Sequence, residues 1–344
     1  ALTIDSRLQY LLYQELEKAG RLQKARWSTG MIVDVQTGEV LALSTWPSFN
    51  SNNLNEMTGE NQRNRALLDV FEPGSVMKPF TVAAALDSGK YTTTSLIDTN
   101  PGSIRVRGYT IRDHNNLGRI TLGTLLQKSS NVASTKIALS LPPDAITNMQ
   151  KQFGFGSKTP LQFPGEGSGL VVTPKEKETS RRATVSYGYG LQVTLAQVAQ
   201  AYSALAAGGV MHPLTLTKDG ERPPSKRIMA HEQAMSIVQM MESVTEPGGT
   251  AKGAAIDGYR FAGKTGTSLR INPKGGYYTD QYRNVFAGMA PASNPRLVGV
   301  MLIEDPRGQI YAGLTVAPVF HNVMKEALRL YNVPLDKPLK TVAQ

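Results

Sequence analysis

The chain has 344 residues, 40% of them hydrophobic and 19% charged, which excludes a disordered protein and favours one large domain or two interleaved subdomains. It contains no cysteine, which excludes disulfides, thiolate metal sites and cysteine nucleophiles. The net charge of +10 favours solubility or attraction to an anionic surface, and the scattered basic residues match no nucleic-acid-binding motif, so no nucleic-acid partner is expected.

The first fifty residues predict a helix followed by a β-hairpin. Asp5 is suited to cap a helix that runs to about Gly20, because leucines recur on one face at helical spacing. Two apolar runs, residues 31–35 and 40–43, flank a turn at residues 36–39 and predict the hairpin. No apolar stretch approaches the roughly 20 residues of a membrane span, and no signal peptide is recognisable.

The middle of the chain predicts mostly short helices and turns. A helix is expected from Ser75 to about Ser88, ending near Gly89. Another is capped by Thr194 and ends at Gly208-Gly209, and a third spans roughly residues 231–245.

Strand patterns return late, at residues 258–267, 285–291 and 297–303, before a last helix at residues 317–331. The loops between these strands are too short for crossovers, so the pairing is predicted to be antiparallel. We therefore expect an α+β fold. Residues 1–50 and 251–344 would form the sheet part, and a mostly helical subdomain, residues 51–250, would be inserted between its second and third strands.

Ser75 and Lys78 form an S-x-x-K pattern at the start of the predicted helix. Gly74 allows a tight turn, and a helix start offers unpaired N–H groups to a developing negative charge. Lys78 lies one turn further along the same face. Burial or neighbouring cations would lower its pKa from about 10.4, so that a neutral amine takes the Ser75 proton. Alone, the pattern is more often a capped helix with a surface lysine.

Ser129-Ser130-Asn131 lies 54 positions after Ser75 and predicts a polar turn between two helices. In this turn Ser129 would relay a proton to a leaving nitrogen, and Asn131 would bind Lys78 and a substrate carbonyl. Alone, such a turn is usually only structural.

Lys264-Thr265-Gly266-Thr267, 135 positions after Ser129, ends a strand that can pair with a peptide substrate. Lys264 would supply positive charge near Ser129 and near a substrate carboxylate, which the hydroxyls of Thr265 and Thr267 can bind. Gly266 would let a ligand backbone come close, and the N–H groups of Ser75 and Thr267 are candidates for an oxyanion hole. The order and spacing of the three motifs point to a serine acyltransferase that uses lysine as its base.

The three motifs resemble those shared by penicillin-binding proteins and class A β-lactamases. Similarity to the class B penicillin-binding proteins covers nearly the whole chain, notably residues 64–66, 71–75, 128–132, 187–191 and 317–320. The chain is thus identified as a member of that family, among the septal transpeptidases of Gram-negative cell division. The resemblance implies the penicillin-binding transpeptidase fold over residues 1–344. The family's N-terminal anchor and pedestal domain are expected to be missing, since residues 1–5 read as the interior of a longer protein.

The resemblance also implies an activity. Ser75 would form an acyl-enzyme with a peptidoglycan stem peptide that ends in D-Ala-D-Ala, and an amine of a neighbouring stem would complete the cross-link. β-Lactam antibiotics would acylate the same serine. No cofactor and no metal are implied. The full-length protein would lie at the periplasmic face of the inner membrane and contact divisome membrane proteins.

Aromatic side chains are implied along the binding cleft, namely Tyr187, Tyr189 and Tyr282. Family members often carry a further pair of adjacent aromatics followed by two glycines, where this chain has Ile310-Tyr311-Ala312-Gly313. Tyr311 is thus the one aromatic expected there, and the size and mobility of that wall are expected to differ.

Three other functions remain open. A class A β-lactamase is disfavoured because Ser130 replaces the usual aspartate. A D,D-carboxypeptidase, which transfers the acyl group to water, shares all three motifs. A β-lactam sensor or divisome scaffold would retain the fold and acylation without turnover. The four histidines, His114, His212, His231 and His321, lack metal-binding spacing and are expected to be structural or at the surface.

Overall fold

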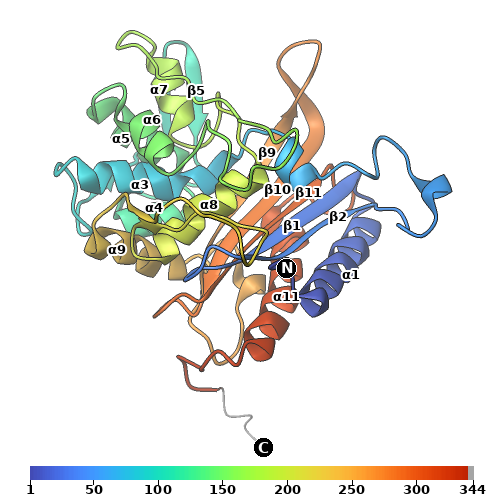
Figure 1. The fold of residues 1–344 in the computed structure, drawn as a ribbon. Coiled ribbons are helices and arrows are strands. Elements are labelled where there is room, and N and C mark those ends of the chain that lie inside the picture. Colours follow the sequence, from blue (N-terminus) through green and yellow to red (C-terminus); the bar gives the residue numbers. More distant parts are fainter. Residues whose placement is uncertain (340–344) are drawn as a thin grey trace, which may run out of the picture.

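One antiparallel sheet joins the two ends of the chain in the computed structural model, which describes residues 1–339 (Figure 1). Across the sheet the strands are β2 (Val40–Trp46), β1 (Trp27–Asp34), β11 (Leu297–Glu304), β10 (Tyr277–Ala290) and β9 (Ala262–Ile271). The register of β1 with β11 runs from Trp27 opposite Glu304 to Asp34 opposite Leu297. The predicted α+β fold with an antiparallel sheet is confirmed, and β9 forms one edge of the sheet.

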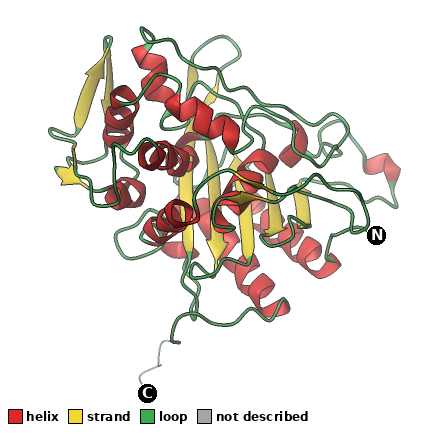
Figure 2. Ribbon diagram, turned by 60° about the vertical axis from the view of Figure 1, so that its left-hand side comes forward, coloured by secondary structure: helices red, strands yellow, loops and turns green. Residues whose placement is uncertain are grey.

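Helices cover both faces of this sheet, which is why β1 and β11 are buried along their whole length (Figure 2). On one face lie α1 (Ser6–Leu22), with Asp5 as its N-cap, and α11 (Ala317–Leu330). On the other face lies α8 (Leu195–Ala206), which contacts β1, β10 and β11. Thr194 and Gln197 form a capping box at its start, and every residue of this helix is buried.

Most of the other helices gather beyond α8 and beside β9 (Figure 1). They are α3 (Lys78–Asp87), α4 (Leu122–Lys128), α5 (Asn131–Ser140), α6 (Ala145–Gln152), α7 (Thr179–Val185) and α9 (His231–Glu242). The short helix α2 (Arg65–Leu68) instead contacts α8, β1 and β2. A short helix, α10 (Ala312–Thr315), precedes α11. The expectation of helices and turns omitted three short strand pairs, β3 (Ile97–Asp98) with β6 (Arg119–Ile120), β4 (Ser103–Val106) with β5 (Tyr109–Arg112), and β7 (Val210–Met211) with β8 (Lys226–Arg227).

Several predicted boundaries differ from the structure, at one helix and two strands. Ser75 lies in a 3-10 helix, Gly74–Met77, and the α-helix begins only at Lys78. β9 and β10 extend as a hairpin beyond their predicted limits, β9 to Ile271 and β10 from Tyr277, because backbone pairing continues where the side chains are only partly buried or exposed.

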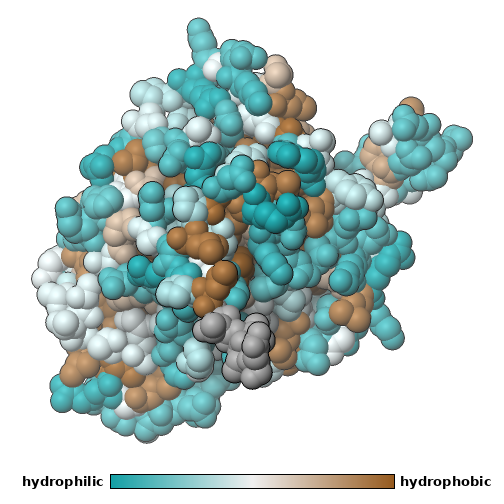
Figure 3. Space-filling view, turned by 90° about the horizontal axis from the view of Figure 1, so that it is seen from below, coloured by the Kyte–Doolittle hydropathy of each residue, from teal (hydrophilic) through white to brown (hydrophobic). Residues whose placement is uncertain are grey.

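The surface below the sheet is mainly hydrophilic, with a smaller apolar patch near its centre (Figure 3). Leu335 and Leu339, in the segment after α11, are exposed apolar side chains. Among residues 1–339, no helix combines the length and apolar character needed to cross a membrane.

Candidate active site

Ser75 sits on a turn that other segments hold from two sides. Gly74 has a φ of +61°, which glycine adopts without strain, and its N–H donates to the Gly188 carbonyl at 3.0 Å. A Cβ on Gly188 would lie 1.9 Å from the Gly74 oxygen, so residue 188 must be glycine for this contact. On the other side, a Cβ on Gly266 would lie 2.8 Å from the Pro73 oxygen. The expected reason for Gly266, room for a ligand backbone, is therefore corrected: its neighbour is the protein's own turn.

Lys78 begins α3, and its side chain is completely buried. Its Nζ lies 3.0 Å from Ser75 Oγ, 3.0 Å from Ser129 Oγ, 2.6 Å from the Ser129 carbonyl oxygen and 2.8 Å from Asn131 Oδ1. The last two oxygens can only accept, so they take two N–H groups of the amine. A neutral amine then presents its lone pair toward the serine hydroxyls.

The protonation of Lys78 is set by its surroundings. Burial, and then the charge of Lys264, hold the pKa of Lys78 well below its ordinary value of 10.5, while Asp113 acts in the opposite direction. An ammonium buried beside a second cation is unfavourable, which promotes the neutral base.

Ser129 occupies the turn between α4 and α5, as predicted. Its φ of +58° is uncommon for a residue other than glycine, and it directs the hydroxyl between the two motif lysines. Ser129 Oγ lies 3.0 Å from Lys78 Nζ and 3.0 Å from Lys264 Nζ. The three motifs, separated by 54 and 135 positions, thus meet at this one hydroxyl.

Asp113 supports this turn, and the sequence analysis missed it. Its carboxylate accepts the Ser130 hydroxyl at 2.6 Å and the backbone N–H groups of Asn131 and Val132 at 2.6 and 3.0 Å. A carboxylate at a helix N-terminus is stabilised by the helix dipole. The only signal in the sequence is a charged tract, residues 112–114, within a polar region, which by itself indicates a surface loop.

Lys264 is also completely buried, in β9, and its Nζ donates to the Thr265 carbonyl oxygen at 3.0 Å. Burial lowers the pKa of Lys264 to about 7. Near neutral pH this lysine is therefore present both as ammonium and as amine.

A hollow of about 880 Å³ opens above these groups. Of the predicted site residues it is lined by Ser75, Ser129, Asn131, Thr265, Thr267, Tyr282 and Tyr311. Lys78, Lys264 and Gly266 are buried behind this surface rather than part of it. Four further lining residues, Arg112, Lys128, Thr250 and Lys252, were not predicted, and His114, expected to be structural or at the surface, lines the hollow as well.

Both threonine hydroxyls have protein partners at the wall of this hollow. The Thr265 hydroxyl lies 2.7 Å from the Thr250 hydroxyl, and Thr267 Oγ1 accepts the Ala312 N–H at 3.1 Å. A hydroxyl can donate one hydrogen bond and accept two, so each retains positions for a ligand.

Tyr187 and Tyr189 do not line this hollow. They lie edge to face with each other, with ring centroids 5.8 Å apart, and Tyr189 packs in the same way on Tyr277 of the β9–β10 hairpin, also at 5.8 Å. Burial raises the pKa of Tyr187 to about 12, so its hydroxyl stays neutral. Their predicted place along the cleft remains a prediction for a longer ligand. Tyr277 was not predicted, because a tyrosine after two turn glycines indicates only the start of a strand in a hairpin.

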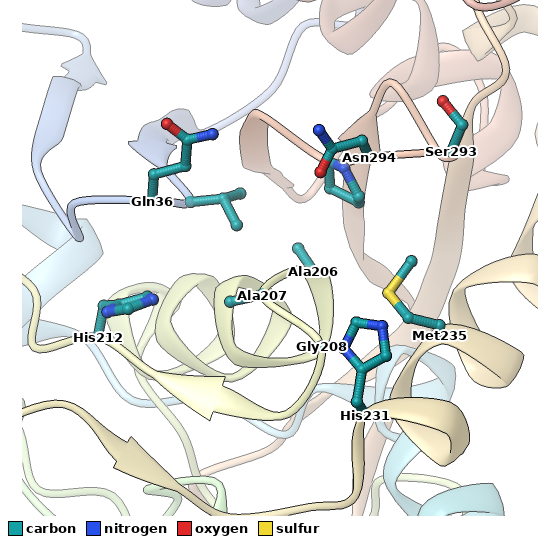
Figure 4. Close-up of a pocket in the computed structure, with 11 residues that line it drawn as sticks. Gln36, Ala206, Ala207, Gly208, His212, His231, Met235, Ser293 and Asn294 are labelled. Atoms are coloured by element: carbon teal, nitrogen blue, oxygen red, sulfur yellow. The ribbon is translucent and has the colours of Figure 1, made fainter.

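A second cavity, of about 420 Å³, lies away from the serine site and contains two of the four histidines (Figure 4). His212 and His231 face it from opposite sides, and His212 Nδ1 lies 2.7 Å from Ser225 Oγ. His321 Nδ1 lies 2.7 Å from the Ala255 carbonyl oxygen. In residues 1–339, no three His, Asp or Glu side chains gather as metal ligands would.

The arrangement as a whole suits transfer of an acyl group through a serine ester. It combines a half-buried hydroxyl, a buried amine within proton-transfer distance, a second hydroxyl bridging to another cation, and a free sheet edge at β9.

Comparison with known proteins agrees with this chemistry. Residues 28–325 match the family model described as penicillin binding protein transpeptidase domain. Over 337 residues the chain is 43% identical to the peptidoglycan D,D-transpeptidase FtsI of Escherichia coli, covering 98% of this chain and 57% of that protein. It is 36% identical to the probable peptidoglycan D,D-transpeptidase PenA of Neisseria gonorrhoeae, covering 99% and 58%.

A solved structure is similar over almost its whole length. The transpeptidase domain of penicillin-binding protein 3 from Burkholderia pseudomallei superposes with a TM-score of 0.88 at 40% identity, covering 98% of each chain. The chain thus spans the length of that domain, but little more than half the length of the E. coli and N. gonorrhoeae relatives.

Proposed function

Since the chain belongs to the transpeptidase domains of the class B penicillin-binding proteins, we propose that it catalyses peptidoglycan D,D-transpeptidation at the division septum. The observation that carries this proposal is the position of Ser129 Oγ, 3.0 Å from the amines of both Lys78 and Lys264, with Ser75 Oγ also 3.0 Å from Lys78.

Acylation begins when the neutral amine of Lys78 takes the Ser75 proton and Ser75 Oγ attacks the carbonyl carbon of the penultimate D-Ala. The N–H groups of Ser75 and Thr267 stabilise the oxyanion. The C–N bond then breaks. The leaving nitrogen takes a proton from the Ser129 hydroxyl, and the Lys78 ammonium returns a proton to Ser129. The terminal D-Ala then departs.

Deacylation reverses this sequence with a new nucleophile. An amine of a neighbouring stem peptide attacks the Ser75 ester, loses a proton to the neutral Lys78, and forms the cross-linking amide. Ser75 Oγ leaves and recovers its proton. A β-lactam acylates Ser75 in the same first step, but its leaving nitrogen stays attached through the opened ring.

Substrate recognition follows from the wall of the hollow. The hydroxyls of Thr265 and Thr267 and the charge of Lys264 bind the terminal carboxylate, and the free edge of β9 pairs with the stem backbone. Tyr187, Tyr189, Tyr282 and Tyr311 contact the longer parts of the donor or a β-lactam side chain. In the full-length protein, we place the domain at the periplasmic face of the inner membrane, in contact with divisome membrane proteins.

A single assay separates this function from its alternatives. The chain is given a donor peptide ending in D-Ala-D-Ala, with and without an acceptor amine, and the products are identified by mass spectrometry. A transpeptidase forms the amide with the acceptor. Hydrolysed donor alone, whatever the acceptor concentration, would instead identify a carboxypeptidase, and penicillin labelling without donor turnover would identify a sensor or scaffold.

Replacing Lys264 by alanine is expected to weaken carboxylate-bearing donors far more than the amidated donor, because charge-assisted hydrogen bonds contribute roughly 1.5–3 kcal/mol. In the unsubstituted protein, carboxylate affinity should fall as the pH rises through about 7, where the Lys264 ammonium loses its proton. The measurement is the half-saturation concentration of both donors at about pH 6 and about pH 8, roughly one unit below and one unit above that pKa.

Lys252→Ala is the matched control for Lys264→Ala, since Lys252 lines the same hollow with an exposed side chain. It should shift the affinity for both donors little. Equal losses for the carboxylate and amidated donors in Lys264→Ala would show that Lys264 serves the chemistry and not recognition. Thermal melting of each variant verifies that it is folded.

A further inference from the structure

The segment between β11 and α10, residues 305–311, leads into one wall of the hollow, and we call it the wall segment. It ends in Ile310 and Tyr311, whose side chains line the hollow and remain largely exposed. Tyr311 meets the exposed ring of His114 edge to face, with ring centroids 6.3 Å apart, so even this contact is open to solvent. Their position therefore depends on how the backbone of the segment is fixed.

The middle of the wall segment, residues 307–309, is fixed by one residue of the opposite end of the chain, while its far end is held by the Asp305 N–H, which donates to the Tyr282 carbonyl oxygen at 2.8 Å. Gln23, the C-cap of α1, accepts three consecutive backbone N–H groups. Its carbonyl oxygen accepts those of Arg307 at 2.7 Å and Gly308 at 3.2 Å, and its side-chain Oε1 accepts that of Gln309 at 3.0 Å. The next residue along the chain is Ile310.

The fit at Gln23 is close. Gln23 is only 7% exposed, although it lies at a helix end. A Cβ on Gly308 would lie 2.6 Å from Gln23 Oε1, so glycine is what lets the glutamine side chain reach the segment. At the near end, the Ala312 N–H donates to Thr267 Oγ1 at 3.1 Å. Ile310 and Tyr311 thus lie between two fixed points of the backbone. One is Thr267, close to the catalytic groups, and the other is the remote Gln23.

Gln23 itself is firmly placed, because α1 packs along β1, β2 and α11. An anchor on a helix that is buried against the sheet is more rigid than one on a loop. We propose that Gln23 is a positioning residue, which, through the wall segment, sets the place of Ile310 and Tyr311 and thereby the affinity for ligands with large side chains. The inference rests on the proposed function, in that the hollow is taken to be the acylation site.

The test compares Gln23→Ala with Gln23→Glu, in which a carboxylate oxygen still accepts the Gln309 N–H. Gln14→Ala is the control, because Gln14 is an exposed glutamine of the same helix whose side chain donates to the Tyr10 hydroxyl. Acylation is followed by stopped flow with two ligands, a penicillin with a bulky biaryl side chain and the unsubstituted aminopenicillanic acid nucleus. Each gives a saturating rate constant and a half-saturation concentration.

Gln23→Ala should raise the half-saturation concentration of the bulky penicillin about two- to tenfold, the range expected for one lost hydrogen bond. The saturating rate constant and both constants for the unsubstituted nucleus should stay unchanged, because Ser75 and Lys78 are untouched. Gln23→Glu should restore the affinity, and Gln14→Ala should match the unsubstituted protein. Hydrogen exchange should quicken at residues 307–311 in Gln23→Ala, but not in Gln23→Glu or Gln14→Ala.

Gly308→Ala provides a second, independent variant. Its methyl group displaces the Gln23 side chain, so it should reproduce the effect of Gln23→Ala on the bulky penicillin. In a Gln23→Ala background the same change should have little further effect, a non-additivity that marks direct contact.

Two outcomes would overturn the inference. One is an equal loss for both ligands, or no loss for either, in a folded Gln23→Ala protein that still acylates. The other is additivity of Gln23→Ala and Gly308→Ala. Failure of the unsubstituted protein to acylate with any penicillin would instead refute the proposed function, so the two failures are distinguishable.

Discussion

Replacing Ser75 by alanine is expected to abolish covalent labelling by penicillin and leave the fold intact. The Ser75 hydroxyl has one side-chain partner, Lys78 Nζ at 3.0 Å, and that amine keeps three other oxygen neighbours from Ser129 and Asn131 when the hydroxyl is removed. Neither a buried unpaired group nor a large cavity results, so we expect little loss of stability.

The measurement for Ser75 is intact mass after incubation with penicillin, followed by peptide mapping of the adduct. One acyl group per chain is expected in the unsubstituted protein, on Ser75, and none in Ser75→Ala. Ser88→Ala, an exposed serine just after the same helix, should label normally. An adduct on any other residue, or persistent labelling of Ser75→Ala, would show that the nucleophile is elsewhere.

Replacing Lys78 by arginine is expected to slow acylation by roughly a thousandfold, since a positioned general base contributes about 10²–10⁴ in rate. A guanidinium keeps its proton at working pH and cannot accept that of Ser75. It also adds bulk to a fully buried site, so thermal melting must accompany the rate measurement. Lys78→Met, similar in length and uncharged, gives a second variant without a base. A rate within a few-fold of the unsubstituted protein in both would show that Lys78 is not the base.

The same base predicts a pH dependence with a definite sign. Below the pKa of Lys78 the amine is protonated and cannot act, so acylation should slow as the pH falls. Lys264 contributes to holding that pKa below 10.5, after burial. Lys264→Ala removes this repulsion, so the pKa of Lys78 should rise and the acidic limb of the rate profile should move to higher pH. A limb that stays in place would show that the two lysines do not interact in this way.

Local sequence determined many helix ends and strand pairings, because these depend on interactions between residues that are close in the chain. Asp5 and Thr194 cap their helices as predicted, since a cap needs only a side-chain oxygen and the next few N–H groups. Short connections made the last three strands antiparallel. The same reasoning placed Ser75 in the first turn of an α-helix, where the structure has a 3-10 helix, because its conformation depends on contacts with Gly188 that lie far away in the sequence.

The residue types of the site were likewise readable from order and spacing, which named Ser75, Lys78, Ser129 and Lys264. Sequence alone could not establish that both lysines are completely buried, that their amines meet at one hydroxyl, or that their pKa values are thereby lowered. Nor could the roles of Asp113 and Gln23 be predicted, because the fold brings their partners to them from distant segments. Motifs and helix caps, which involve residues a few positions apart, can be predicted from the sequence. Burial, electrostatics and backbone anchoring arise only when distant segments pack together.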